Sequence, residues 1–531
     1  MAVLVRNVPP CVLHEDDHFL VVNKPESLNT HAPAPFAGDG IYEWLKHREP
    51  HWADLAIIHR LDKETSGVIV FGKSAAANRS LTQQFSNHSV RKRYLLLTDR
   101  PVRQKEWTVR SALVRVGDKY QARPEHAGAE MAETRFRVIG AEDNTTLVAA
   151  EPLTGKTHQI RVHSASCGLP ILGDDLYGGT EWPRLCLHSE SIAFRHPVSS
   201  AEVKFTVPPG FANRTGAAIR SALTDTGTNA FRLVNGASDG APGLFVDRLG
   251  EYLLVQNEAP LSEMELQLVT NLAAHHLCRG VYQKVLTKKV RGKGTAETSP
   301  SRLMGEIAPE RFGVVENGIH YELSFTEGYS VGLFLDQREN RRKLLFEHIG
   351  AKFECKLAGA EVINTFAYTC AFSVSAALAG ARTTSLDLSK KYLNWGKRNF
   401  QLNGIADGQD FIFGDTFDWL KRFARKKRTF DFVLLDPPTF SQSQESGVFQ
   451  ADRDYGKLVT AALGVLKSGG ILFCSTNSAR LKPETFLEQI QNAIRAQGRR
   501  VLQSQYVPQP PDFPISRLEP AYLKTIWLRI G

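Results

Sequence analysis

The chain has 531 residues, more than one hydrophobic core usually holds, which predicts about three domains. Hydrophobic residues make up 42% and charged residues 23%, as in ordinary globular proteins, and no apolar run has the length of a membrane span or a signal peptide. The seven cysteines form no CxxC pair, which disfavours a zinc site or a disulfide framework and favours a reducing cytoplasm. The formal net charge of +9 suits a polyanionic partner, although charge alone leaves the nature of the partner open.

The first two hundred residues contain short β-rich runs bounded by turn residues, such as FLVVNKP at 19–25 and GVIVFGK at 67–73. They end in VPPGFANRTGAA at 207–218, where proline, glycine and small residues are typical of a linker. We therefore expect a first domain over 1–212 and a linker over 213–230.

The rest of the chain changes its pattern once. Strand-like runs flank a Gly/Asp/Pro turn in FRLVNGASDGAPGLFVDRLGEYLLVQ, which predicts a small α+β domain over 231–345. Beyond it the strand-like runs AEVINTF, TTSLDLS, FDFVLLDPP and ILFCSTN alternate with helical segments. This alternation is typical of a parallel, doubly wound sheet, so we expect an α/β Rossmann-like domain over 346–531.

The motif HRLDKETSG at 59–67 places Asp62 just before an apolar run and among positive charges. A lone aspartate at such a place is more often a turn residue or a helix cap bridged to Arg60. Two further segments change this interpretation, because TGKTHQIRVH supplies Arg161 on a predicted strand and RKRYLLL supplies Tyr94. An aspartate kept ionised by an arginine can act as a nucleophile or base, and an aromatic ring beside basic residues suits an extruded nucleobase.

Five blocks, HRLDKETSG, KRY, TGKTHQIRVH, GDDLYGG and RLCLHS, occur in the order found in RluA-type pseudouridine synthases, and this resemblance covers about residues 10–210. It implies an α+β domain with a mixed, largely antiparallel sheet and a catalytic cleft that isomerises uridine to pseudouridine in RNA without a cofactor. By motif position, Asp62 is the catalytic aspartate, Tyr94 packs on the target base, and Arg161 pairs with the aspartate.

Polar residues follow the strands of the predicted α/β domain. The loop NTFAYTCAF at 364–372 follows the first strand, Asp387 ends the second, Asp415 follows the third, and Asp436 in DPPTF follows the fourth. An acid about twenty residues after such a loop suits the ribose of a nucleoside cofactor, and ligands bind at this carboxyl edge of a parallel sheet. The loop lacks GxGxxG, which disfavours a dinucleotide. Each acid alone is more often a loop residue than a ligand.

In this order, the motifs resemble class I S-adenosylmethionine-dependent methyltransferases, and more narrowly the RlmI and RlmK type that acts on large-subunit ribosomal RNA, over about residues 230–531. The resemblance implies S-adenosylmethionine as cofactor. The residues that would hold it are Gln337, Arg338, Asn364, Phe366, Asp387 and Asp415. The first two belong to a segment that closes over the cofactor, the next two shape its methionine end, and the last two hold its ribose and adenine. Asp436 would face the methyl group and the target base.

Two departures from that family's pattern bear on the chemistry. Cys370 and Ala371 stand where its loop has a pair of glycines. Asn477 stands where cytosine-C5 enzymes have a nucleophilic cysteine, and Cys474 faces the opposite side by strand alternation, as a core residue would. Cytosine C5 needs a thiolate at C6, whereas guanine N7 carries its own lone pair and needs only positioning. We therefore expect methylation at guanine N7, with Asp436 and Asn477 on the base edge, and cytosine C5 as the alternative.

Together these motifs predict a bifunctional RNA-modifying enzyme in the cytoplasm. We expect large-subunit rRNA as partner, with tRNA as a second candidate, no membrane and no metal; the oligomeric state stays open. One alternative is a single live site with the other domain as an RNA-binding platform, and another is a non-catalytic ribosome-assembly factor. The basic stretch KVLTKKVRGKG at 284–294 is predicted to bind RNA phosphates, whereas RFARKKR at 422–428 is as well explained by a solvated face.

Overall fold

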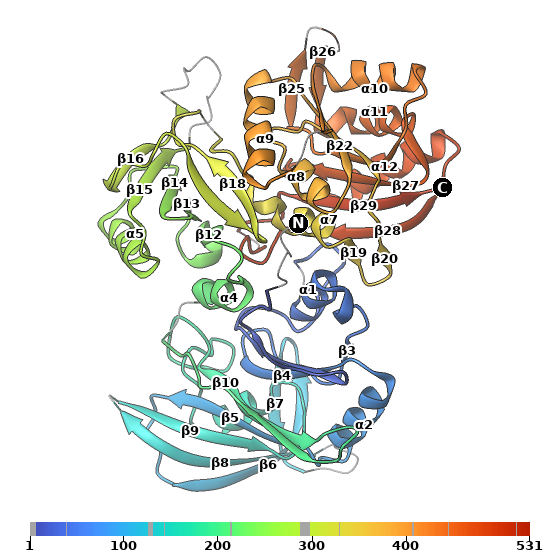
Figure 1. Ribbon diagram of the computed structural model, residues 1–531. Coiled ribbons are helices and arrows are strands. Elements are labelled where there is room, and N and C mark those ends of the chain that lie inside the picture. The colour runs from blue at the N-terminus through green and yellow to red at the C-terminus, as the bar shows by residue number, and fades with distance from the viewer. Residues whose placement is uncertain are drawn as a thin grey trace.

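Figure 1 shows the computed structural model of the chain. It describes residues 7–38, 40–125, 131–142, 144–212, 215–286, 298–328, 330–405, 408–443, 445, 447–516 and 518–531. None of the helices within these ranges combines the length and the apolar character needed to cross a membrane.

An 11-stranded sheet forms the N-terminal part, in the order β1-β2-β4-β10-β5-β9-β8-β6-β7, with β3 beside β4 and β11 beside β10. Its strands are β1 (Val12–Glu15), β2 (Phe19–Lys24), β3 (Ala56–Ile57), β4 (Ser66–Gly72), β5 (Arg91–Thr98), β6 (Glu106–Val116), β7 (Lys119–Arg123), β8 (Met131–Glu142), β9 (Thr145–Pro152), β10 (Leu187–Arg195) and β11 (Glu202–Thr206). Its helices are α1 (Ile41–Arg48), α2 (Ala75–Ser86) and α3 (Gln159–Ser166). Only the β4–β10 pair is parallel among these described strands, which confirms the mixed, largely antiparallel sheet.

The segment 213–230, which we predicted to be a linker, contains a packed helix, α4 (Thr215–Leu223). Ile219 and Leu223 are buried against the N-terminal core, where α1 contributes Trp44. Their spacing of four residues puts them on one helix face. The proline and glycine residues that indicated a linker lie mostly before this helix, so the composition of the whole segment was misleading.

A five-stranded sheet in the order β12-β13-β14-β15-β16 follows, with a separate hairpin of β17 and β18. The elements are β12 (Ala230–Asn235), β13 (Leu244–Leu249), β14 (Tyr252–Asn257), α5 (Glu263–His275), β15 (Gly280–Val285), β16 (Ser301–Gly305), β17 (Phe312–Glu316) and β18 (Ile319–Leu323). From residue 287 onward the basic stretch 284–294 lies outside the described residues, so its RNA contact stays a prediction.

A seven-stranded sheet forms the C-terminal part, in the order β23-β22-β21-β24-β27-β29-β28. Its strands are β21 (Glu361–Thr365), β22 (Arg382–Asp387), β23 (Asp410–Phe413), β24 (Phe430–Leu435), β27 (Leu466–Thr476), β28 (Val501–Val507) and β29 (Lys524–Ile530). The flanking elements are α7 (Arg338–Leu345), β19 (His348–Gly350), β20 (Phe353–Glu354), α8 (Ala371–Leu378), α9 (Lys390–Leu402), α10 (Thr416–Arg425), β25 (Phe440–Ser443), β26 (Gly447–Gln450), α11 (Ala451–Leu463) and α12 (Pro483–Ala496). The first five strands in spatial order are parallel, and β29 runs antiparallel to both of its neighbours.

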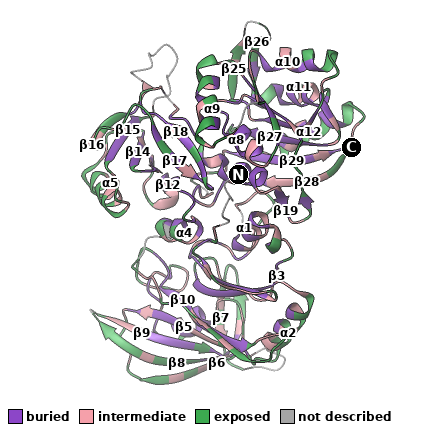
Figure 2. Ribbon diagram, in the orientation of Figure 1, coloured by how far each residue is buried: buried purple, intermediate pink, exposed green. Residues whose placement is uncertain are grey.

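Both faces of this sheet are covered, which is why its central strands, such as β27, appear buried in Figure 2. Val433 and Leu435 of β24 pack with α10, α11 and α12, whereas Phe432 and Leu434 pack with α7 and α8. The predicted doubly wound sheet is therefore confirmed. The strand order reverses between β21 and β24, so the crevice that receives ligands in such sheets lies at their carboxyl ends.

A polar interface joins the N-terminal and C-terminal parts, where α1 packs against α7 and β19 (Figure 1). Arg342 of α7 pairs with Glu49, and both side chains are 4% exposed. His348 donates from Nε2 to the carbonyl oxygen of Lys46 at 2.8 Å, which satisfies an acceptor at the end of α1. The last turn of α1 thus depends on groups from the C-terminal part.

Candidate functional sites

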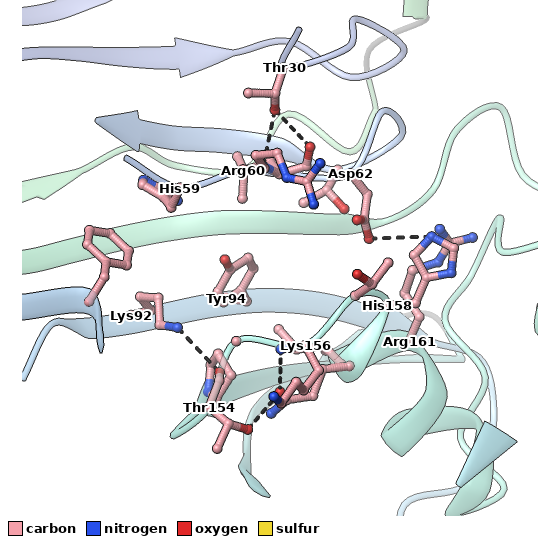
Figure 3. Close-up of a pocket in the computed structure, with 18 of the residues that line it drawn as sticks. Thr30, His59, Arg60, Asp62, Lys92, Tyr94, Thr154, Lys156, His158 and Arg161 are labelled. Atoms are coloured by element: carbon pink, nitrogen blue, oxygen red, sulfur yellow. Dashed lines mark hydrogen bonds and ion pairs between the residues drawn. The ribbon is translucent and has the colours of Figure 1, made fainter. Parts of the chain in front are cut away.

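A pocket of about 840 Å³ opens in the N-terminal part (Figure 3). It brings together Asp62, Tyr94 and Arg161, the three residues singled out in the sequence. The basic and histidine side chains that line it are His31, His59, Arg60, His88, Lys92, Lys156, His158 and Arg161. Asp62 is the single acidic residue in the described lining. Such a pocket has the charge to receive a phosphate-bearing ligand and one carboxylate to react with it.

The loop that carries Asp62 is fixed on both sides of that residue. Thr30 accepts the Leu61 N–H at 3.1 Å and donates its hydroxyl to the Leu61 carbonyl at 2.8 Å. On the other side, the buried ammonium of Lys24 donates to the Lys63 carbonyl at 3.1 Å. Asp62 is therefore held by its neighbours' backbone while its own carboxylate stays directed into the pocket (Figure 3).

The Asp62 carboxylate is 26% exposed and feels opposing influences. Burial raises its pKa, whereas the nearby charges of His158 and Arg161 lower it, and burial is the larger effect. The basic group beside the Asp62 carboxylate is His158, whose Nε2 lies 4.0 Å from Asp62 Oδ2.

Arg161 does not pair directly with Asp62, so that prediction is wrong. Arg161 donates from Nε and Nη2 to Asp174 at 2.8 and 2.7 Å, and Nη1 lies 3.6 Å from Glu64. The Asp174 side chain is completely buried, and a buried carboxylate needs such a two-pronged partner. Arg161 therefore acts on Asp62 through its charge rather than through a hydrogen bond.

Arg161 also lies on helix α3 and not on the strand that the sequence indicated. The β-branched residues of TGKTHQIRVH favour a strand, but the Gln159 side chain accepts from Thr154 Oγ1 at 2.8 Å and from the Lys156 N–H at 3.0 Å. These bonds close a turn from which the helix begins, an effect of side chain on backbone that periodicity does not reveal.

Tyr94, His59 and Phe85 place their rings in the wall of the pocket. Tyr94 lies on β5, and burial raises its pKa to about 12, so its ring is a neutral wall. His59 stacks on Phe85 with ring centroids 4.6 Å apart, and burial lowers the pKa of His59 to about 3. The histidine of the HRLD motif is therefore a neutral part of the wall, while Arg60 is exposed at the mouth.

The second candidate site lies at the carboxyl ends of the parallel strands in the C-terminal part. Asp387, at the end of β22, accepts the Tyr368 N–H on Oδ2 and the Ser389 N–H on Oδ1, both at 2.8 Å. It thereby ties the loop after β21 to the next strand. Each carboxylate oxygen keeps a second lone pair for a ligand hydroxyl.

The loop after β21 holds three non-glycine residues in the left-handed region, Phe366, Tyr368 and Cys370, with φ of +56°, +50° and +62°. Cys370, which stands at a glycine position of the resemblance, is fully buried in the core. A Cβ atom built on Gly396 of α9 would lie 2.3 Å from the Cys370 sulfur, so the thiol fills space that this glycine leaves. The side chain thus packs against α9.

Gln337 and Asp436 meet in the crevice. Gln337 Nε2 donates to Asp436 Oδ1 at 3.0 Å and to Ser475 Oγ at 2.8 Å, and Asn340 donates to Gln337 Oε1 at 2.8 Å. Burial raises the pKa of the Asp436 carboxyl to about 6. Gln337 therefore connects the segment before α7 to the ends of β24 and β27.

Other predicted cofactor residues have partners within the fold. Arg338 is buried and donates to both oxygens of Asp512, at 2.9 and 2.5 Å. Asn364 is buried and donates to Ser373 Oγ of α8 at 2.9 Å. Arg338 is therefore engaged in a salt bridge away from the crevice carboxylates, and Asn364 supports the loop through α8.

The last predicted residues differ in exposure. Asp415 is buried and accepts the Asp418 N–H at 3.0 Å. It is the N-cap of α10, a structural role that is common for an aspartate at the start of a helix. Asn477 is exposed just beyond the end of β27. Cys474 is buried in the core with α11 and α12, as strand alternation predicted.

The basic stretch 422–428 ends α10 and the turn after it. Since α10 begins at the carboxyl end of β23 and ends where β24 begins, these residues lie at the sheet edge opposite the crevice. Their place at a helix C-terminus, where cations are stabilised, favours the solvated face over an RNA contact beside the second site.

Comparison with known families gives two matches. The model of the RNA pseudouridylate synthase family matches residues 18–166, and that of the S-adenosylmethionine-dependent methyltransferase family matches 257–529, just over half of the chain. Asp62, Tyr94 and Arg161 lie within the first match, and Asp387 and Asp436 lie within the second.

Individual relatives resemble one part of the chain each. The ribosomal RNA large subunit methyltransferase of Deinococcus radiodurans is 33% identical over 322 residues, which cover 59% of this chain and 76% of the relative. The ribosomal RNA large subunit methyltransferase K/L of a Psychrobacter species is 40% identical over 174 residues, 32% of this chain and 20% of the relative. The structure of human RNA Pseudouridylate Synthase Domain Containing 4 is 26% identical, with 37% of this chain and 88% of that one covered and a TM-score of 0.31.

Proposed function

The chain belongs to the S-adenosylmethionine-dependent methyltransferases and carries an RNA pseudouridylate synthase domain ahead of that unit, and on this premise we propose that it modifies large-subunit ribosomal RNA twice. It isomerises a uridine in the N-terminal pocket and methylates guanine N7 in the C-terminal crevice. The Deinococcus radiodurans relative, named as a large-subunit rRNA methyltransferase, supports the choice of RNA. We place the domains at 1–212, 231–345 and 346–531, with the segment 213–230, which contains α4, between the first two.

The observation that carries the isomerase proposal is the single carboxylate in a basic pocket. The cationic side chains bind the phosphates that flank the target uridine, and the extruded uracil packs on the Tyr94 ring. Asp62 acts on the sugar as nucleophile or as base, so that the N-glycosidic bond breaks and the uracil turns until C5 joins C1′. The C5 proton leaves and N1 gains one, which leaves the composition of the nucleotide unchanged.

The crevice residues fit S-adenosylmethionine, because Asp387 combines two bonds to the loop with free lone pairs where a ribose would lie. The bound cofactor supplies an electrophilic methyl group. Gln337 orients Asp436, and Asp436 in its charged form accepts hydrogen bonds from the donor edge of a guanine. Phe366 and the neighbouring left-handed backbone form the wall of the cofactor site.

Guanine N7 is favoured over cytosine C5 because the crevice has no suitable thiolate among the described residues. Cys474 is buried in the core, and burial raises the pKa of its thiol far above neutral. The exposed Asn477 offers an amide, which can hold a base edge but cannot add to C6 of cytosine.

The test uses RNA from a strain in which the gene is deleted. Purified wild-type protein and S-adenosylmethionine should add both pseudouridine and 7-methylguanosine to its large-subunit rRNA, as read by nucleoside mass spectrometry. Asp62→Asn should remove pseudouridine and leave 7-methylguanosine, and Asp387→Ala should do the reverse. The exposed Asp175→Asn is the matched control and should keep both.

Three results would contradict the proposal. Normal pseudouridine formation by Asp62→Asn would remove Asp62 from the mechanism. The appearance of 5-methylcytidine would replace guanine N7 by cytosine C5. Modification by only one domain, or by neither despite tight RNA binding, would support the platform or the assembly-factor alternative.

A further inference from the structure

A row of side chains outside the three motif residues leads to Asp62, and its first two members, Tyr177 and His158, lie within hydrogen-bond distance of each other. The Tyr177 hydroxyl lies 2.8 Å from His158 Nδ1, and His158 Nε2 lies 4.0 Å from Asp62 Oδ2. The Tyr120 N–H donates to the same tyrosine oxygen at 3.0 Å. Figure 3 shows the His158 ring directed at the Asp62 carboxylate, with Arg161 behind it.

These contacts define the proton positions on His158. The Tyr177 oxygen already accepts from Tyr120, so its own hydrogen is free to point at His158 Nδ1. Burial lowers the pKa of His158, which favours a neutral ring with a single N–H. If Nδ1 accepts, that N–H is on Nε2 and faces Asp62. In the other tautomer, the Tyr120 N–H and the His158 Nδ1–H would both point at the Tyr177 oxygen, and the Nε2 lone pair would face the Asp62 carboxylate and repel it.

The backbone supports the same geometry. His158 has φ +54°, in the left-handed region that non-glycine residues seldom adopt, and it immediately precedes α3. The Tyr177 ring is held in turn by the Arg161 guanidinium, 5.2 Å from its centroid. The ring of His158 is thus fixed from its backbone side and from its Nδ1 side.

We propose that Tyr177 and His158 are positioning residues for Asp62, with the Tyr177 hydroxyl fixing the tautomer that presents an N–H from His158 to the carboxylate. This inference rests on the isomerase function proposed for the pocket. Because Arg161 is held by Asp174, His158 Nε2, 4.0 Å away, is the basic group left to support the Asp62 oxygen. The charged and titratable groups that face His158 are Asp62, Glu64, Tyr120, Arg161, Asp174 and Tyr177.

The test compares variants that remove single groups. Tyr177→Phe deletes the hydroxyl but keeps the ring that Arg161 contacts, and we expect kcat for pseudouridine formation to fall about tenfold or more, with KM unchanged. The acid limb of its pH profile should move upward, since the carboxylate is less well supported. The exposed Asp175→Asn, two residues away in sequence, is the control, with wild-type kinetics expected.

His158 offers a second pair of variants. His158→Gln can place an amide N–H near the position of Nε2, whereas the shorter His158→Asn places it near Nδ1. We expect the glutamine variant to retain more kcat than the asparagine variant. Equal losses in both would show that the imidazole position matters only for folding and would overturn the proposal.

The outcomes also separate this inference from the proposed function. Wild-type kcat and pH profile in Tyr177→Phe, with an inactive Asp62→Asn, would overturn the positioning role and leave the isomerase in place. If the wild-type protein makes no pseudouridine, the proposed function fails, and ¹⁵N spectra of histidine-labelled protein still decide the tautomer. A His158 Nδ1 without hydrogen that changes in Tyr177→Phe supports the arrangement, and a protonated Nδ1 overturns it.

Discussion

Gly396 and Cys370 form a complementary pair whose disruption has a calculable effect. Gly396 lies inside α9, and an added Cβ would approach the Cys370 sulfur to 2.3 Å and its Cβ to 2.9 Å. We therefore predict that Gly396→Ala destabilises the C-terminal part and loosens the loop that holds the cofactor. The hydrogen bond that the Tyr368 N–H donates to Asp387 would be strained by the same displacement.

Two opposing contributions determine the size of the effect. Alanine inside a helix is favoured over glycine by roughly 0.5–1 kcal/mol. Overpacking of a filled core costs about 1–3 kcal/mol, and the clash includes the Cβ and sulfur of the short, buried Cys370 side chain. The free energy of unfolding should therefore fall by about 1–2 kcal/mol.

Urea unfolding and calorimetric titration with S-adenosylmethionine measure the two consequences. Cys370→Gly is the matched second variant, because glycine accepts the left-handed backbone at this position. The double variant should recover most of the stability and cofactor affinity lost by Gly396→Ala. If the two changes are instead additive, or if Gly396→Ala is as stable as wild type, the pairing does not control the loop.

Three further predictions test other contacts. Glu49→Gln leaves the buried Arg342 beside Arg48 without its carboxylate and should lower the free energy of unfolding by about 3–5 kcal/mol; an unchanged urea midpoint would show that the interface is not stabilising. Because burial raises the pKa of the Asp436 carboxyl to about 6 and its charged form is the proposed acceptor, kcat/KM for methylation should rise as pH increases through about 6, and Asp436→Asn should abolish that step; a wild-type profile flat from pH 5 to 8 would exclude a charged Asp436 from the reaction. Cys474→Ala should leave methylation unchanged, whereas lost activity and a wild-type adduct with 5-fluorocytosine RNA would make this cysteine the nucleophile.

The sequence by itself determined the fold classes and the places of the two sites. Alternating strand and helix patterns are local, and in a parallel sheet they place the residues that follow each strand at one edge, which is why Asp387 and Asp436 were expected at the edge where the structure has them. Strand alternation also placed Cys474 in the core. The HRLD motif singled out Asp62, the order of the motifs singled out Tyr94, and both residues line the same pocket.

Only the tertiary structure decided which charged groups meet. Arg161 pairs with Asp174 instead of Asp62, and Arg338 pairs with Asp512, although a motif shows only that an arginine is present. Hydrogen bonds depend on differences of less than an ångström, whereas periodicity fixes no more than the face of an element.

The same reason explains the surprises in packing. Helix α4 became part of the N-terminal core because its apolar face met residues far away in sequence. The fit of Cys370 depends on a glycine in the next helix, and His158 gained its place beside Asp62 from the turn that begins α3. Each of these depends on side chains that the chain brings together only on folding, so no local pattern could contain them.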